Sequence, residues 1–167
     1  MQPILTNLEQ ILITKYKTDM VLHLASHTEA FDEAAKLALT DRQPFAWRAA
    51  WLLWECMEAN DPRIDEFIPG IIEALPAKKE GHRRELLKIL LKSDIGEELE
   101  GRLFDICTRM WEQISSRPSV RLMALKMMLK IAEKYPEFKN EISYLAQKHY
   151  LETLSPAVRK SVAKLMK

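Results

Sequence analysis

The sequence contains little glycine and little cysteine, and both shortages narrow the range of functions. Its four glycines are scattered, so no glycine-rich loop of the kind that holds phosphate is present. A Gly-x-Ser-x-Gly nucleophile motif is also missing. The two cysteines, Cys56 and Cys107, lie far apart among bulky apolar neighbours, which predicts core positions and not a redox pair or a metal site. The lack of a disulfide framework favours a cytoplasmic location.

Long apolar stretches and strand-like alternation are missing as well. The longest uninterrupted apolar run, from Ala49 to Trp54, is far too short to span a membrane. No segment alternates β-branched and polar residues, and residues 1–7 do not resemble a signal peptide. Helix-forming residues are plentiful, and 167 residues suffice for one domain with a continuous core. The sequence therefore predicts a single all-α domain over residues 1–167.

The chain as a whole has almost no excess charge. Its formal net charge is +1, which does not favour nucleic acid as a partner. Residues 1–116 carry 14 basic and 20 acidic side chains, whereas residues 117–167 carry 11 basic and 4 acidic ones. This gradient would allow the acidic front of one copy to dock on the basic tail of the next. Scattered charges on solvated helix faces explain the same counts, and we favour that interpretation.

What the sequence does contain is a repeat of 36 to 38 residues, marked by Arg48, Arg84, Arg121 and Arg159. Apolar residues stand three and six places after each arginine, at Trp51, Trp54, Leu87, Leu90, Ala124, Met127, Val162 and Leu165. This spacing places each pair on one stripe of a helix. A period of this length is typical of stacked helix pairs, so the sequence predicts a solenoid.

Each arginine-bearing inner helix is expected to follow an outer helix. The outer helices are predicted at residues 28–39, 62–75, 97–114 and 138–154. Pro69 falls inside the second, where it removes a backbone hydrogen bond and is expected to bend the helix. Residues 1–27 are expected to form one or two capping helices. The four predicted helix pairs then occupy residues 28–59, 62–92, 97–134 and 138–167.

This pattern resembles the HEAT and armadillo repeat family over roughly residues 28–167. The resemblance rests on Pro69 in an outer helix and on the arginine near the start of each inner helix. It implies an α-α superhelix that presents a binding surface, and it says almost nothing about activity. The family also tends to place an acid before the arginine, forming a ladder. Asp41 and Glu152, each seven residues before an arginine, support a partial ladder.

The arginine column is the first candidate binding site. Guanidinium groups along the inner helices can hold phosphate or a carboxylate-rich peptide. Bonding within the scaffold is the competing interpretation, and the upstream acids favour it for Arg48 and Arg159. Arg48 nevertheless stays among the candidate partner-binding residues, because a partner lying along the inner helices would touch it.

Arg83, Arg84 and Arg121 are stronger candidates. Each lies near the start of its helix, where the helix dipole disfavours positive charge, so another interaction must offset that cost. The segment 78–92, which also contains Lys88, is the most basic stretch of the chain. It is the predicted contact surface for an anionic partner.

Trp47, Trp51 and Trp54 share one helical stripe, because they are spaced by four and three residues. An aromatic platform for a base, a proline-rich peptide or a small ligand is one interpretation. Core packing between the first two units is the other, and the sequence favours it. Trp47 and Trp51 are retained as candidate partner-binding residues.

Asp19, His23 and His27 follow one another at intervals of four residues, which is a possible spacing for metal ligands on one helix face. No Glu follows the first His as in zincins, and no further ligand is evident. The sequence therefore predicts neither a metal nor a cofactor, and these three residues are the weak candidate set.

Together these patterns favour a non-enzymatic protein-interaction or scaffold module that binds a segment of another protein on its concave face. One alternative is a nucleic-acid-binding or base-excising protein, similar to the HEAT-like DNA alkylation-repair glycosylases. The resemblance to those enzymes implies a basic concave face with tryptophans and an acid, for which the candidates are the stretch 78–92, Trp47, Trp51 and Asp41. Another alternative is a structural subunit that assembles head to tail. No membrane partner is expected, and the oligomeric state stays open.

Overall fold

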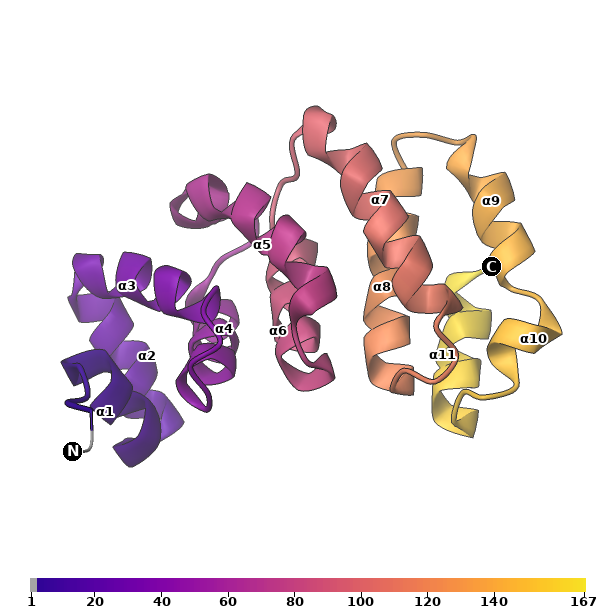
Figure 1. Cartoon of the computed structure of the whole chain (residues 1–167). Coiled ribbons are helices and arrows are strands. Elements are labelled where there is room, and N and C mark those ends of the chain that lie inside the picture. Colours follow the sequence, from indigo (N-terminus) through magenta and orange to yellow (C-terminus); the bar gives the residue numbers. More distant parts are fainter. Residues whose placement is uncertain (1–2) are drawn as a thin grey trace.

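The chain is built from helices stacked side by side in an arched row (Figure 1). The computed structural model describes residues 3–167, which contain helices and loops but no strand. The inner row consists of α4 (Phe45–Cys56), α6 (Glu80–Leu91), α8 (Pro118–Ala132) and α11 (Pro156–Leu165), and successive members pack on one another. No helix within the described range has the length and apolarity needed to cross a membrane.

A second row of helices covers the inner row from outside. In Figure 1, α5 and α7 lie above α6 and α8, while α3 packs on α4 and α9 on α8. Two N-terminal helices, α1 (Asn7–Thr14) and α2 (Lys17–Ser26), pack on the first pair. The predicted all-α, HEAT-like helical-repeat architecture is therefore confirmed. The outer helices are α3 (Thr28–Ala38), α5 (Ile68–Ala74), α7 (Glu97–Glu112) and α9 (Phe138–Leu145).

Side-chain caps explain where two of the helices begin. At the start of α1, the backbone N–H of Glu9 donates to Thr6 Oγ1 at 3.1 Å. The Thr6 N–H donates to Glu9 Oε2 at 2.8 Å, which completes a capping box. Ser155 caps α11 in a simpler way, because its hydroxyl accepts from the Val158 N–H.

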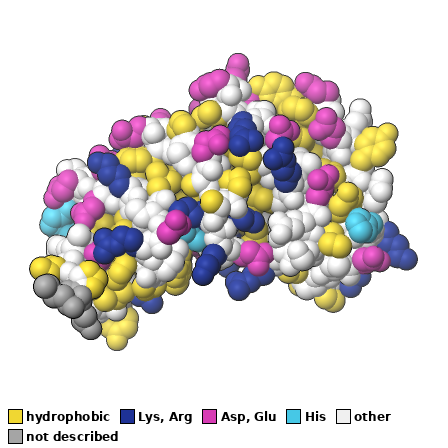
Figure 2. All heavy atoms as spheres, in the orientation of Figure 1, with side chains coloured by type: hydrophobic (Ala, Val, Ile, Leu, Met, Phe, Trp, Pro, Cys, Tyr) yellow, Lys and Arg dark blue, Asp and Glu magenta, His cyan; other side chains and the backbone are white. Residues whose placement is uncertain are grey.

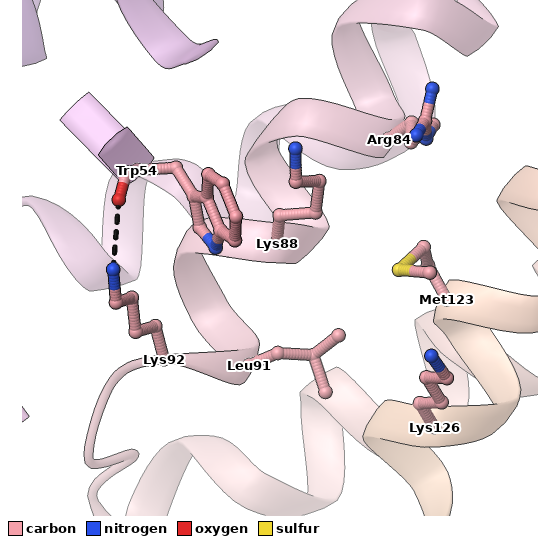
Figure 3. A pocket seen from close by; sticks show the side chains of 7 residues that line it. All are labelled: Trp54, Arg84, Lys88, Leu91, Lys92, Met123 and Lys126. Atoms are coloured by element: carbon pink, nitrogen blue, oxygen red, sulfur yellow. Dashed lines mark hydrogen bonds between the residues drawn. The ribbon is translucent and has the colours of Figure 1, made fainter. Parts of the chain in front are cut away.

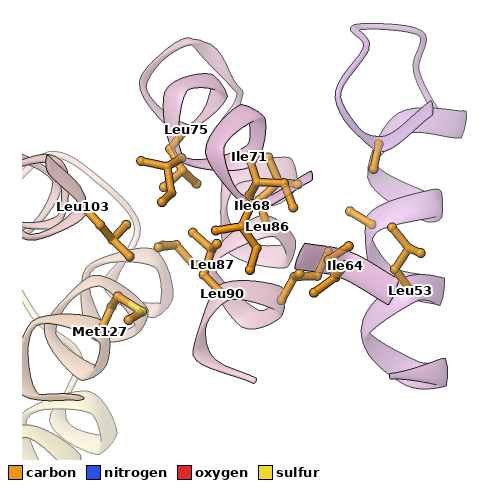
Figure 4. Packing of buried hydrophobic residues seen from close by; sticks show 14 of the residues in the cluster. Leu53, Ile64, Ile68, Ile71, Leu75, Leu86, Leu87, Leu90, Leu103 and Met127 are labelled. Carbon is orange, nitrogen blue, oxygen red and sulfur yellow. The ribbon is translucent and has the colours of Figure 1, made fainter. Parts of the chain in front are cut away.

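The hydrophobic core lies between the two rows and is most complete in the middle of the molecule. Leu87 and Leu90 of α6 and Met127 of α8 are fully buried, and Figure 4 shows them beneath Leu75 and Leu103 of the outer row. The equivalent position of the last inner helix, Leu165, is 39% exposed. Among the described helices, α11 has an inner neighbour on one side only, so its apolar stripe is less covered.

The outer helix of the second unit is not the single bent helix expected over residues 62–75. A 3₁₀ helix, η1 (Pro62–Phe67), precedes α5, and a short 3₁₀ turn, η2 (Leu75–Ala77), follows it. Pro69 lies in the first turn of α5, where its missing N–H would have had no helical partner. Pro69 therefore starts a helix instead of bending one.

The outer helix of the fourth unit is also interrupted, contrary to the expected span of residues 138–154. α9 ends at Leu145, and a single turn, α10 (Lys148–Leu151), follows after a break. The break leaves the carbonyl oxygen of Leu145 to accept from the indole N–H of Trp111 at 2.8 Å. A side chain of the preceding unit thus replaces a helical hydrogen bond.

Candidate interaction surface on the inner helices

Two of the four repeat arginines, Arg48 and Arg121, bind backbone carbonyls within the fold. Arg48 is half-buried, and its Nη1 donates to the carbonyl oxygen of Leu12 at 2.7 Å. Leu12 belongs to the last turn of α1, whose final carbonyls lack helical partners. Arg48 therefore ties the first inner helix to the N-terminal helices.

Arg121 also donates to backbone carbonyls, but unlike Arg48 it is fully buried. Its Nε donates to the carbonyl oxygen of Trp111 at 2.8 Å, and its Nη2 donates to that of Tyr150 at 2.6 Å. Nη1 donates to Thr153 Oγ1 at 3.1 Å, and the guanidinium lies 4.5 Å from the Trp111 ring centroid. Burial lowers the pKa of Arg121, yet a guanidinium stays charged in proteins. The buried cation joins the third and fourth units.

In the second unit, Arg83 binds the backbone carbonyls in place of the repeat arginine Arg84. Arg83 donates from Nε to the carbonyl of Leu75 and from Nη2 to that of Pro76, both at 2.9 Å. Neighbouring helix positions point about 100° apart, so Arg84 faces away from these carbonyls. Arg84 is exposed and has no hydrogen-bond or ion-pair partner within residues 3–167. This shift leaves the second repeat arginine on the surface.

Other cations of the basic stretch are also held by backbone carbonyls. Lys78 Nζ donates to the carbonyl of Leu39 at 2.8 Å and to Asp41 Oδ1 at 2.7 Å. Lys92 Nζ donates to the carbonyl of Trp54 at 2.9 Å. The hydrogen bond and charge of Lys78 hold the pKa of Asp41 below its usual range. Asp41 therefore pairs with a lysine and not with the repeat arginine, so the expected acid–arginine ladder is not formed there.

His82 completes the contact between α6 and α3. Its Nε2 lies 2.6 Å from the carbonyl oxygen of Ala38, and its Nδ1 lies 3.1 Å from Gln43 Nε2. These contacts fit a neutral ring that donates from Nε2 and accepts at Nδ1. Burial lowers the pKa of His82 below its ordinary 6.5, and the hydrogen bond to Ala38 only partly opposes this effect.

A hollow of about 380 Å³, here called the Trp54 hollow, opens between three successive inner helices (Figure 3). Its lining combines cationic ends with aromatic, aliphatic and thioether groups, and it includes no carboxylate of the described residues. α6 and the residue after it supply four of the seven side chains, and α4 and α8 supply the others. The lining residues are Trp54, Arg84, Lys88, Leu91, Lys92, Met123 and Lys126.

The Trp54 ring holds two of these cations in place. Lys88 Nζ lies 3.9 Å and Lys92 Nζ lies 4.9 Å from the ring centroid, which are cation–π distances. Lys88 also forms an ion pair with Glu85 at 3.1 Å. Arg84 and Lys126 are then the two lining cations that have neither an acid nor a hydrogen-bond partner in the described part of the chain.

A second hollow of similar volume, the Trp47 hollow, adjoins the first and shares Arg84. The charge of its Arg117 is offset by Glu80, because the Arg117 Nε lies 3.6 Å from Glu80 Oε2. The backbone N–H of Arg117 also donates to Glu80 Oε1 at 2.6 Å. Its Lys79 is exposed, and no residue from 3 to 167 binds its ammonium. The lining residues are Gln43, Trp47, Lys79, Gly81, His82, Arg84, Glu85 and Arg117.

The three tryptophans of α4 divide between core and surface. Trp51 is half-buried and packs against the core. Trp54 touches the core with part of its ring and faces its hollow with the rest. Trp47 is 38% exposed, and the Arg48 guanidinium lies 5.6 Å from its ring centroid. Core packing thus describes Trp51, whereas Trp47 and Trp54 give the inner face aromatic surface.

Two of the three candidate metal ligands lie side by side, but the three do not form a metal site. The rings of His23 and His27 stack at 4.3 Å between centroids, and His27 Nδ1 lies 3.0 Å from the carbonyl oxygen of His23. Asp19 does not complete a site with them, since residues 3–167 contain no group of three or more His, Cys, Asp or Glu side chains arranged to hold a metal ion.

Sequence reasoning missed several residues of the Trp54 hollow. It selected Arg84 and Lys88 but not Leu91, Met123 or Lys126. A pattern that could have revealed Lys126 is present, because it follows Lys88 by one repeat length of 38 residues. No sequence pattern indicates Met123 or Leu91, since their partial exposure depends on the distance and angle between α6 and α8.

Comparison with known proteins agrees with the geometry. A family model described as a HEAT repeat domain matches residues 5–167. No curated protein and no solved structure gives a significant match.

Proposed function

This chain belongs to the HEAT repeat domain family, and on that premise we propose that it is a non-enzymatic interaction module that binds a segment of another protein on its inner helices. HEAT repeats generally mediate protein interactions, and stacked repeats provide extended surfaces suited to that role. The proposed contact surface consists of the Trp54 hollow and the Trp47 hollow.

The observation that carries this proposal is the pair of adjoining hollows that share Arg84. Several other cations of the first three inner helices donate to backbone carbonyls of a different helix, as Arg48, Arg121 and Lys130 do. Arg84 and Lys126 depart from that pattern within the described residues. Partly exposed tryptophan beside arginine is also the composition typical of residues that dominate binding energy in protein interfaces.

Site-specific photo-crosslinking tests the proposal directly. A photoreactive phenylalanine analogue replaces either Trp47 or Arg84, which line the inner hollows, in cells that naturally produce the chain. The matched controls carry the analogue at Lys36 in α3 or Arg109 in α7, which are exposed on outer helices. We expect both inner positions to capture the same protein and the outer positions to capture none of it. Capture of that protein from the outer positions alone would overturn the proposal.

A further inference from the structure

The chemistry of the Trp54 hollow defines its partner more narrowly than the proposed function, on which this inference rests. We infer that the bound segment is an acidic stretch of polypeptide in which carboxylates flank one apolar side chain. The carboxylates bind Arg84 and Lys126, and the apolar side chain enters the space between Trp54, Leu91 and Met123.

The charge of the hollow is the first part of the argument. Four of its seven lining residues are cationic: Arg84, Lys88, Lys92 and Lys126. The only carboxylate paired with any of them among residues 3–167 is Glu85, which binds Lys88. Lys92 is held by a carbonyl oxygen, which carries no full charge to balance the ammonium. The hollow therefore attracts anions, and a carboxylate can bind a guanidinium through two hydrogen bonds.

The apolar part of the lining is the second part. Trp54, Leu91 and Met123 are each half-buried, and all three pack against the core while bordering the hollow. Figure 3 shows Met123 and Lys126 on α8 facing Trp54 and Leu91 across the hollow. Met side chains adapt their shape to a bound apolar group. A purely ionic ligand would leave this apolar surface in water, so the matching ligand carries a hydrophobic side chain as well as carboxylates.

The number of available cations favours a polypeptide over a nucleic acid. Lys79, Arg84 and Lys126 are the cations of the two hollows whose side chains have no partner in the described chain. A nucleic acid presents a phosphate at every nucleotide, and much of its affinity for a protein comes from neutralising several of these phosphates with Lys and Arg side chains. Three cations separated by aromatic and aliphatic surface instead match spaced carboxylates on a peptide.

Arg84 also indicates where the segment continues. It lines both hollows, so a peptide bound at Arg84 reaches the Trp47 hollow, where Lys79 and Trp47 are exposed. Arg117 is already paired with Glu80 and adds little attraction there. The peptide therefore makes its main contacts at the Trp54 hollow and extends past Arg84 toward Lys79.

Selection from a display library of random linear peptides tests the inference. The full chain serves as bait, and recovered peptides are then measured by fluorescence anisotropy against R84Q/K126Q. The matched control is K36Q/R109Q, which removes two exposed cations from the outer helices. We expect peptides rich in Asp and Glu around an apolar residue, with binding weakened about tenfold for each inner cation removed. The control variant should bind like the original chain, and thermal melts should show all variants folded.

The outcomes separate this inference from the proposed function. Peptides that lack acidic residues but lose binding in M123Q would overturn the inference and leave the inner-face proposal standing. Peptides unaffected by R84Q/K126Q and by M123Q would contradict both, as would recovery of no peptide. A random single-stranded oligonucleotide that binds the chain and displaces the peptides, with the same loss in R84Q/K126Q, would replace the polypeptide partner with nucleic acid.

Discussion

Arg121 and Arg159 occupy the same place in the repeat, but their surroundings are opposite. Arg121 is fully buried and donates to two backbone carbonyls, whereas Arg159 is exposed and no described residue binds it. Replacing Arg121 by Met keeps most of the volume but leaves both carbonyls unsatisfied. We expect this change to lower the free energy of unfolding by about 3 kcal/mol. Urea denaturation measures the loss, and Arg159→Met should stay within about 0.5 kcal/mol of the original chain. Equal effects would show that the buried contacts do not stabilise the fold.

His82 gives the fold a dependence on pH. Its pKa is lowered in the folded state by burial and by the nearby Lys78 ammonium, while the Ala38 hydrogen bond and Asp41 oppose the shift. The unfolded chain therefore binds the proton more readily, so this contribution to stability is complete above about pH 6.5 and is lost as the pH falls. Thermal melts should show a steeper acid decline for the original chain than for His82→Gln. His149→Gln, at an exposed histidine, should keep the original slope.

At the scale of helices, lysines connect the inner row end to end. Lys130 Nζ of α8 donates to the carbonyl of Leu91 at 3.0 Å and to that of Ser93 at 2.6 Å, at the end of α6. Lys92 does the same for the end of α4, one repeat length earlier. Lys130→Met should therefore lower the free energy of unfolding by about 1–3 kcal/mol. Lys126→Met, one turn away, should leave stability unchanged but weaken peptide binding. If Lys126→Met lowered stability and Lys130→Met weakened only peptide binding, the roles assigned to the two lysines would be wrong.

The helix scale also shows what could be predicted from sequence. The period of the arginines and apolar residues indicated the helical repeat, because burial between stacked helices requires that spacing. It could not indicate which arginine stays exposed. That depends on where the preceding helix ends and offers its carbonyls: Leu75 and Pro76 face Arg83 and leave out Arg84. The break after Leu145 was missed for a similar reason, since it depends on the Trp111 indole that donates to the Leu145 carbonyl. At Pro69 a bend was predicted, but the residue lies in the first turn of α5 instead.

The whole molecule is nearly neutral, and Figure 2 shows basic and acidic side chains interspersed over the visible face. This near neutrality determines how weakly the molecule binds polyanions. With a net charge of +1 and many cations bound to carbonyls, we expect almost no retention on a heparin column at physiological salt. Weak retention at low salt should be reduced by Arg84→Gln and unchanged by Arg109→Gln. Strong retention that declines steeply with salt would instead support the nucleic-acid alternative.

The walls of the Trp54 hollow belong to three successive hairpins, and this has a mechanical consequence. Superhelices of stacked hairpins bend by small rotations between neighbours, and each such rotation moves Trp54, Leu91 and Met123 relative to one another. The hollow consequently has this shape only at one particular curvature of the superhelix. A peptide bound in the Trp54 hollow therefore opposes both a decrease and an increase in the curvature of the superhelix. The middle of the molecule becomes stiffer as the fraction of molecules with bound peptide rises.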